Sequence, residues 1–323
     1  MYYTFNISSL YIFSLTLHTF TVFIIISIIM RRIFGIFVLI FIVSFIAMPS
    51  YAIKIGLYTN QPSVMVSASD EAQMIDVKTN RQVCIIHKML MYEITPLDKD
   101  KMIVRSNWGQ CTVYTNNAVI KPLDTTACVY TKDNWYRGIL RIENRDNSIT
   151  VINDLGLENY LQSVVPSEMP SSWDMEALKA QAISARTYAI ANIGKHAKEG
   201  FDLVDTQMDQ VYNGVKSELE STNNAVLETA GIIMTYDNKP ISAMYCSAGG
   251  GQTTSALDSF GREIPYLQSV PSYDDDVQKM GHGVGMTQHG AKNLAKMGNN
   301  AYQILTHFYN NIQFAKINPV YYK

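Results

Sequence analysis

The sequence predicts an α+β protein, in which a helical core is flanked by strand-rich segments and preceded by an N-terminal signal segment. Three observations support this prediction. The first 52 residues are apolar and contain only two charges, Arg31 and Arg32. Residues 53 to about 152 form short alternating or β-branched runs that are broken by turn residues. From Leu157 onward, apolar residues recur at helical spacing.

Residues 1–52 have the layout of a secretion signal. Met30-Arg31-Arg32 is a short basic start, residues 33–48 are an apolar run, and Ser50-Tyr51-Ala52 is a small-x-small cleavage site. Residues 1–29 are a second apolar segment, which a signal peptide does not need. We therefore expect translation to start at Met30 and the mature chain to begin at Ile53.

A membrane anchor is the alternative interpretation of this leader, with residues 5–29 and 33–48 each spanning the bilayer. The second stretch has 16 residues, whereas a helix that crosses a bilayer needs about 20. The length therefore favours a cleaved signal peptide. In both cases the rest of the chain lies outside the cytoplasm, in the cell envelope or periplasm.

The charge balance excludes one class of partner. Removing Arg31 and Arg32 from the 26 basic residues leaves 24 against 28 acidic ones, a net charge of −4 for residues 53–323. The mature chain therefore has no basic field to hold nucleic acid.

The cysteines agree with an extracytoplasmic location without defining a site. Their positions show no spacing typical of a zinc site, so no metal and no cofactor are expected. Two interpretations stay open, a disulfide between two of the first three cysteines or buried free thiols, and no pair is favoured. The four residues are Cys84, Cys111, Cys128 and Cys246.

Residues 53–136 are expected to form a strand-rich N-terminal region. Strand-like runs continue to residue 152, and each is bounded by turn residues. The runs are IKIGLYT, VCIIHKMLMYEIT, KMIVRS, CTVYT, YRGILRIE and ITVIN.

Two helices are expected next. The first begins at Leu157 and ends at Pro166, because proline cannot continue a helix. The second is about 22 residues long, with Ser171 and Ser172 able to cap its start and Gly200 beyond its end.

The second helix is expected to be central in the fold. Small side chains on one of its faces allow another element to approach closely, and two basic residues share a different face. The first face contains Leu178, Ala182, Ala185 and Ala189, and the second contains Lys179 and Arg186.

The rest of the chain alternates short elements with glycine-rich loops. We expect a helix over 217–230, a hairpin around Asp237-Asn238-Lys239, and final helices over 288–297 and 302–309. The YCSAGGG and GHGVG stretches are expected to be loops.

Glu168 is the carboxylate with the clearest potential for chemistry. It lies in a corner between the two helices, bracketed by Pro166 and Pro170 and next to Met169 and Trp173. Apolar neighbours raise the pKa of a carboxyl group, whereas the positive end of the following helix lowers it. Taken alone, the residue is more simply a solvated or capping glutamate.

The glycine loops offer a second kind of chemistry. Cys246 or Ser247 could act as a nucleophile with His282 as base and the glycine N–H groups as an oxyanion site. The G-x-S-x-G elbow and an orienting acid are missing. A nucleotide site or a His282–His289 metal site is disfavoured, because neither has the required context or spacing.

The motifs taken together resemble the SpoIID/LytB family, which comprises stage II sporulation protein D, its lytic transglycosylase relatives and the amidase enhancers. The resemblance covers residues 137–310 almost continuously, and residues 54–136 only loosely. Its segments, in the family's order, are IKIGL, LENYLQSVVPSEMPSSWDMEALKAQAISARTYAI, DQVYNG, AVLETAGIIMTYDNKPISAMYCSAGGG, PYLQSV and GHGVGMTQHGAKNLAKMG.

The resemblance implies a helical catalytic domain over 137–323 that cleaves peptidoglycan glycan strands, with a cell-wall amidase as a further partner. It implies that Glu168, within the matched Ser167-Glu168-Met169, is the catalytic acid. The positions that it places around the substrate are Gln181, Arg186, Tyr245, Ser247, His282 and Gln288. Some members bind zinc, but no matching cysteine and histidine cluster is present.

One carboxyl group is sufficient for this chemistry, because a lytic transglycosylase uses the sugar's own C6 hydroxyl as nucleophile. The expected function is therefore lytic transglycosylase with a 1,6-anhydro product, on strands whose stem peptides an amidase has removed. The alternatives are a non-catalytic wall-binding enhancer of an N-acetylmuramoyl-L-alanine amidase, and a hydrolase that uses Cys246 or Ser247.

Two departures from the family's pattern affect the substrate site. Only PSYDDDVQKM separates PYLQSV from GHGVG, where the family has a longer strand-rich stretch, so part of the cleft wall is expected to be missing. The family has the motif S-T-S-G-G, which is followed by T-E. Here residues 247–251 read S-A-G-G-G and are followed by Thr253-Thr254.

Overall fold

The computed structural model describes residues 52–317, which contain six α-helices and four β-sheets. The predicted α+β class is confirmed. Residues 52–317 belong to one compact unit. The predicted signal peptide, the start at Met30 and the membrane anchor lie outside the described residues. Within residues 52–317, no helix has the length and apolar character that a membrane span requires.

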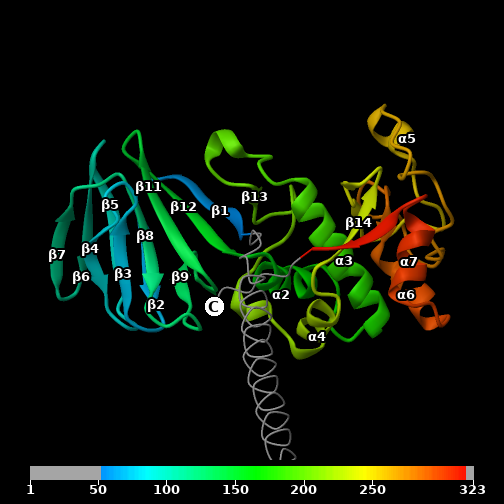
Figure 1. The fold of residues 1–323 in the computed structure, drawn as a ribbon, viewed down its shortest axis with the longest axis horizontal. Helices are drawn as coiled ribbons and strands as arrows, with labels where there is room; N and C mark the ends of the chain where they lie inside the picture. The colour runs from blue at the N-terminus through cyan, green and yellow to red at the C-terminus, as the bar shows by residue number, and fades with distance from the viewer. Residues whose placement is uncertain (1–51, 318–323) are drawn as a thin grey trace, which may run out of the picture. The chain divides into compact units, whose positions relative to one another are not determined.

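Two antiparallel sheets make up most of the N-terminal half (Figure 1). The seven-stranded sheet has the order β13-β1-β12-β11-β8-β3-β4, and only β13 is parallel to its neighbour. The six-stranded sheet has the order β10-β9-β2-β5-β6-β7. The bounds are β1 Ala52–Gln61, β2 Val64–Ala68, β3 Ala72–Asp76, β4 Arg81–Ile86, β5 Tyr92–Asp98, β6 Lys101–Ser106, β7 Gly109–Val113, β8 Asn117–Pro122, β9 Val129–Thr131, β10 Asn134–Tyr136, β11 Ile139–Arg145, β12 Ser148–Gly156 and β13 Leu203–Val204.

The inward-facing residues of both sheets contribute to one apolar core. Burial alternates along β3 and β11, as expected for strands with one covered face. β12 is buried along nearly its whole length, because it is paired on both edges and leads directly into the helical region. Residue 136 is the predicted end of the strand-rich N-terminal region, and the seven-stranded sheet combines strands that precede it with strands that follow it.

The run VCIIHKMLMYEIT differs from the sequence prediction, because it forms two strands. β4 ends at Ile86 and β5 begins at Tyr92. Between them Met89 adopts a positive φ of 58°, and its N–H bonds to the carbonyl of Ala68 (2.8 Å). This non-local hydrogen bond stabilises a turn that the apolar pattern alone does not reveal.

Helix α2, Leu157–Glu168, begins where predicted but continues past Pro166. The prediction that Pro166 ends the helix is wrong. The helix loses the hydrogen bond that the proline nitrogen cannot make, but Ser167 Oγ donates to the carbonyl of Ser163 (2.7 Å) and the Met169 N–H to that of Val165 (2.9 Å). These bonds retain the last turn.

Helix α3, Met175–Ala191, is shorter than predicted at both ends. Asp174, rather than Ser171 or Ser172, is the N-cap, and its side chain accepts from the Glu176 N–H (3.1 Å). At the other end, the Asn192 side chain bonds to the carbonyl of Tyr188 (2.8 Å) and closes the helix. Gly200 instead ends the short 3₁₀ helix η1, Ala197–Glu199.

The central position of α3 is confirmed, although its small-residue stripe is shared between two cores. Ala182, Ala185 and Ala189 pack in the core of the sheets and α2. Leu178 packs in a second core with Ile183 and the C-terminal helices. A helix buried on two sides needs small residues, because neighbouring backbones must approach it closely.

The three predicted C-terminal helices agree with the structure within a few residues. The hairpin is shorter than predicted, Tyr245 and Cys246 of the predicted YCSAGGG loop form a strand, and a helix over 256–260 and a strand over 313–316 were not predicted. Only two residue pairs join β14 and β15, and β14 pairs mainly with β18 at the chain's end. The bounds are η2 Val215–Ser217, α4 Glu220–Glu228, β14 Ile232–Tyr236, β15 Lys239–Pro240, β16 Tyr245–Cys246, α5 Ala256–Phe260, β17 Met286–Thr287, α6 Gln288–Lys296, α7 Ala301–Phe308 and β18 Gln313–Lys316.

Candidate functional site

Glu168 is the last residue of α2, so it lies at the negative end of a helix. The sequence pattern predicts instead a position before the positive end of α3. A carboxylate at a helix C-terminus is disfavoured by the helix dipole, which favours the protonated form. The continuation of α2 past Pro166 therefore changes the sign of the helix contribution.

Neutral donors surround the Glu168 carboxyl group. Oε1 accepts from the Val211 N–H (3.1 Å), and Oε2 accepts from the Gln288 side-chain amide (3.4 Å). The Tyr245 side chain also hydrogen-bonds to it. Burial raises the pKa of Glu168 above its ordinary value of 4.5, and these three hydrogen bonds offset the rise only in part.

A chain of polar side chains supports Tyr245. The Tyr160 hydroxyl donates to Gln210 Oε1 (3.2 Å), and Gln210 Nε2 donates to the Tyr245 hydroxyl (2.9 Å) and to the Ala185 carbonyl (3.3 Å). Burial holds the pKa of Tyr245 well above its ordinary value. The Tyr245 hydroxyl therefore keeps its proton, accepts from Gln210 and donates toward Glu168.

Gln210 is a site residue that sequence reasoning missed. It is fully buried, and its position within DQVYNG was the available signal. That segment also supplies the Val211 N–H to Glu168. One short loop thus contacts the carboxyl group directly through its backbone and indirectly through Tyr245.

Two sequence-distant motifs meet at Glu168 through a parallel strand pair. β16 pairs with β17, with Tyr245 opposite Met286 and Cys246 opposite Thr287. Thr287 then caps α6, in which Gln288 is the first residue. Gly285 permits this close pairing, because its φ is 75° and an added Cβ would lie 2.0 Å from the Met244 carbonyl oxygen.

The neighbouring carboxylates differ from Glu168 because each is paired with a cation. Asp205 binds Lys132 Nζ (2.6 Å), and Asp209 binds Lys195 and His196 Nε2 (the latter at 3.0 Å). Despite its burial, these partners lower the pKa of Asp209. For Asp205, burial outweighs Lys132 and raises the pKa. Glu168 forms no salt bridge with any residue in the described range 52–317.

Arg186 lies away from solvent, and its predicted contact with substrate has no support in this geometry. Its Nε and Nη2 donate to the two oxygens of Glu158 (2.8 and 2.7 Å), and both side chains are fully buried. The remaining donors reach the carbonyls of Val226 and Ile232 and the hydroxyl of Thr229. All five guanidinium N–H groups therefore have protein partners.

Gln181 is also fully buried, but its side-chain amide is unpaired. Neither the nitrogen nor the oxygen has a partner among residues 52–317. An unpaired buried amide costs free energy. Gln181 therefore keeps both a donor and an acceptor that protein atoms do not use.

His282 and Cys246 are held in ways that do not favour nucleophilic catalysis. His282 Nδ1 accepts from the Val284 N–H (2.9 Å), and burial lowers the pKa of the ring. The Cys246 thiol is buried, which raises its pKa to about 11. Ser247 Oγ has no hydrogen bond to His282 within the described part of the chain. The Cys246 or Ser247 hydrolase therefore lacks an assembled base.

A family model matches the segment that contains Glu168. Residues 145–236 match the family described as SpoIID, stage II sporulation protein. This segment contains Glu168, Gln210 and the whole of α3. This segment belongs to the SpoIID family.

Relatives of the chain match it over part of their length. Stage II sporulation protein D of Bacillus amyloliquefaciens is 41% identical over 136 residues, which cover 38% of this chain and 40% of that protein. The amidase enhancer of Bacillus subtilis is 42% identical over 107 residues, 33% of this chain and 14% of the enhancer. An uncharacterised protein of Brachyspira hyodysenteriae is 34% identical over 203 residues, 62% of this chain and 50% of that protein. The chain therefore spans half or less of the length of these relatives.

The short PSYDDDVQKM stretch holds the glycine loop in place. Asp274 is fully buried and accepts from the N–H groups of Gly249 (2.8 Å) and Gly251 (2.9 Å). Although burial disfavours its charge, hydrogen bonds from Ser272 and these two N–H groups lower the pKa of Asp274. Asp274 thereby fixes the glycine loop that follows Ser247.

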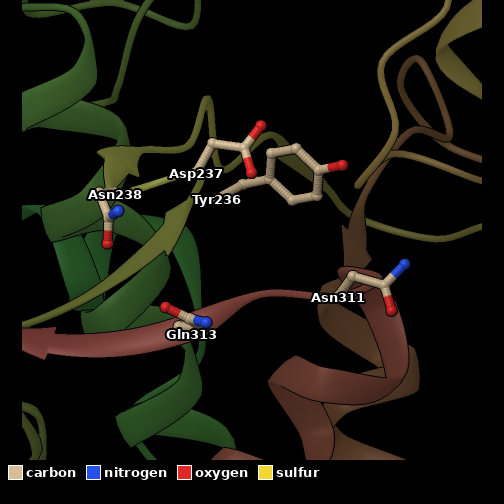
Figure 2. A pocket seen from close by; sticks show the side chains of 5 residues that line it. All are labelled: Tyr236, Asp237, Asn238, Asn311 and Gln313. Atoms are coloured by element: carbon tan, nitrogen blue, oxygen red, sulfur yellow. The ribbon is translucent and has the colours of Figure 1, made fainter.

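A separate polar hollow lies at the tip of the β14–β15 turn. Figure 2 shows its five lining side chains, none of which is a residue predicted for the substrate site. They come from the end of β14 and the turn that follows it, and from the segment after α7 and the first residue of β18. The residues are Tyr236, Asp237, Asn238, Asn311 and Gln313.

Proposed function

We propose that this chain is an extracytoplasmic peptidoglycan lytic transglycosylase, which cleaves glycan strands with a 1,6-anhydro product. Membership of the SpoIID family implies a function related to the cell wall. The observation that carries the finer proposal is the environment of Glu168. Its carboxyl group is largely buried, receives hydrogen bonds from neutral donors and has a raised pKa.

A raised pKa is what the first step requires. Glu168 donates its proton to the oxygen of the glycosidic bond, and the bond to the anomeric carbon breaks as positive charge develops on the sugar ring. The resulting carboxylate then accepts the proton of the sugar's own C6 hydroxyl, whose oxygen bonds to the anomeric carbon. The proton returns to Glu168, so the cycle needs no second acid and no water.

The state of the neighbouring carboxylates supports this mechanism over hydrolysis. Both hydrolytic mechanisms need a second free carboxylate beside the bond. Asp205 and Asp209 are each engaged by a cation. An intramolecular hydroxyl, in contrast, is already held at high effective concentration by the sugar itself.

The proposed substrate contacts follow from the availability of hydrogen-bonding groups. Tyr245 and Gln288 lie beside the carboxyl group. Gln181 has an unpaired amide, but its side chain is fully buried, so it is left out of the proposed contacts. Ser247 and His282 belong to loops that converge on β16 and β17. Arg186 is left out, because its donors are occupied by the protein. The preferred substrate is glycan from which stem peptides have been removed.

The test compares wild-type protein with Glu168→Gln on intact and amidase-treated peptidoglycan, with mass spectrometry of the products. Glu168→Gln keeps the shape of the side chain but cannot transfer the proton. We expect the rate of anhydro-product formation to fall by a factor of about 10² to 10⁴, the range for one general acid–base group. The fraction of the protein that sediments with glycan should be unchanged. Glu263→Gln, at an exposed glutamate, is the matched control and should keep full activity. Substantial anhydro product from Glu168→Gln would exclude Glu168 as the catalyst.

A second candidate function is an enhancer that binds the wall and activates an amidase. The similarity to the amidase enhancer of Bacillus subtilis favours it, but the matched part covers 14% of that protein. The same experiment separates the two functions. An enhancer would yield no anhydro product from either form and would stimulate amidase equally in both.

A further inference from the structure

Cys84 and Cys111 lie next to each other although they belong to different sheets. Cys84 is on β4, the edge strand of the seven-stranded sheet, and Cys111 is on β7, the edge strand of the six-stranded sheet. Their Sγ atoms are 3.3 Å apart. No other two cysteines are in contact within residues 52–317.

We propose that Cys84 and Cys111 form a disulfide in the exported protein, which joins the free edges of the two sheets. The inference rests on the extracytoplasmic location in the proposed function, because disulfides persist in oxidising compartments. The two sulfur atoms are 3.3 Å apart, which is about 1.3 Å more than the length of a disulfide bond.

The pair is accessible to a disulfide donor. Both cysteines are partly exposed and line a shallow depression with His87, Tyr92 and Trp108. The proposed oxidant is a protein or glutathione disulfide. One cysteine thiolate attacks the donor disulfide and forms a mixed disulfide, and the second thiolate then displaces the donor's remaining thiol. Two protein thiols are oxidised, and one donor disulfide is reduced to two thiols.

Burial, together with a hydrogen bond and charge repulsion from Cys111, raises the pKa of the Cys84 thiol to about 12. Two of these three causes disappear once Cys111 is held in a mixed disulfide, so burial alone then holds up the pKa of Cys84.

The other cysteines provide matched controls. Burial raises the pKa of the Cys128 thiol, and that of Cys246 to about 11. Neither contacts a second cysteine in the described range. They should stay reduced under conditions that link Cys84 to Cys111.

The first arm of the test examines protein recovered from the cell envelope in the presence of an alkylating agent. Peptide mapping without reduction is expected to show a linked Cys84–Cys111 peptide and two alkylated thiols after denaturation. The Cys128→Ser variant should retain the link, whereas Cys84→Ser and Cys111→Ser should each lose it. Four alkylated thiols in envelope protein would overturn the proposal.

The second arm treats the purified protein with oxidised and reduced glutathione. We expect selective linkage of the same pair and a rise in the urea midpoint of about 1 M, typical of a disulfide that closes a loop of this size. Linkage that involves Cys128 or Cys246, or no linkage, would overturn the pairing. Activity distinguishes this failure from failure of the proposed function, because Cys84→Ser leaves the Glu168 site unchanged and should form as much anhydro product as wild type.

Discussion

The buried Arg186–Glu158 pair allows a decisive test of whether Arg186 is structural or binds substrate. The perturbation is Arg186→Met, which keeps an unbranched side chain but removes the charge. Glu158 would then lose both bonds to the guanidinium, at 2.8 and 2.7 Å, and keep only the Gly231 N–H at 3.2 Å. A fully buried carboxylate would remain without a counter-charge.

The expected loss of stability follows from this environment. Removing one partner of a buried ion pair costs about 3–5 kcal/mol, a large part of the roughly 5–15 kcal/mol that stabilises a typical domain. With a denaturant slope of about 3 kcal/mol/M in urea, the midpoint should fall by about 1 to 1.7 M. The double variant Arg186→Met/Glu158→Leu should recover most of the loss, because it removes both charges.

The assay combines urea unfolding followed by circular dichroism with kinetics on glycan. Arg262→Met, at an exposed arginine, is the control and should leave the midpoint unchanged. Folded Arg186→Met should keep the wild-type KM. An unchanged midpoint together with a raised KM would refute the structural role and restore Arg186 as a substrate contact.

Three further predictions concern Glu168 and its surroundings. Because the pKa of Glu168 is raised in the folded state, the stability that its protonated form contributes is lost as pH rises through that pKa. Glu168→Gln should therefore have a higher urea midpoint than wild type at about pH 7 and an equal one below about pH 4. A lower midpoint for the variant at neutral pH contradicts the raised pKa. Tyr245→Phe removes a hydrogen bond that lowers the pKa of Glu168, so that pKa should rise in the variant. The alkaline limb of the pH–rate profile should then move to higher pH, and a move to lower pH would count against this contact. Cys246→Ala should keep most of the activity, because the thiol is buried with a pKa of about 11; complete loss in a folded variant would return Cys246 to consideration as a nucleophile.

Local sequence patterns were sufficient for the type of most of the elements. The change from a period of two to helical spacing near Leu157 predicts the transition from β12 to α2, and the turn residues between the apolar runs predict most strand ends. Small residues along α3 predict its burial. These features depend on residues a few positions apart, so the sequence contains nearly all the information that determines them.

Element ends were less predictable where a distant or side-chain bond decided them. Pro166 is tolerated in α2 because Ser167 and Met169 retain the hydrogen bonds of the last turn. The break between β4 and β5 depends on a bond from Met89 to Ala68. Propensity describes one residue at a time and does not include such partners.

The sequence by itself determined the α+β class, the central helix and, through resemblance to the SpoIID family, the importance of Glu168. Only the tertiary structure decided how the site is built. The pairing of β16 with β17 brings Tyr245 and Gln288 to Glu168, and the same packing buries Arg186 against Glu158. The physical reason is that desolvation and hydrogen-bond partners set the pKa of Glu168, and both come from segments far apart in the chain.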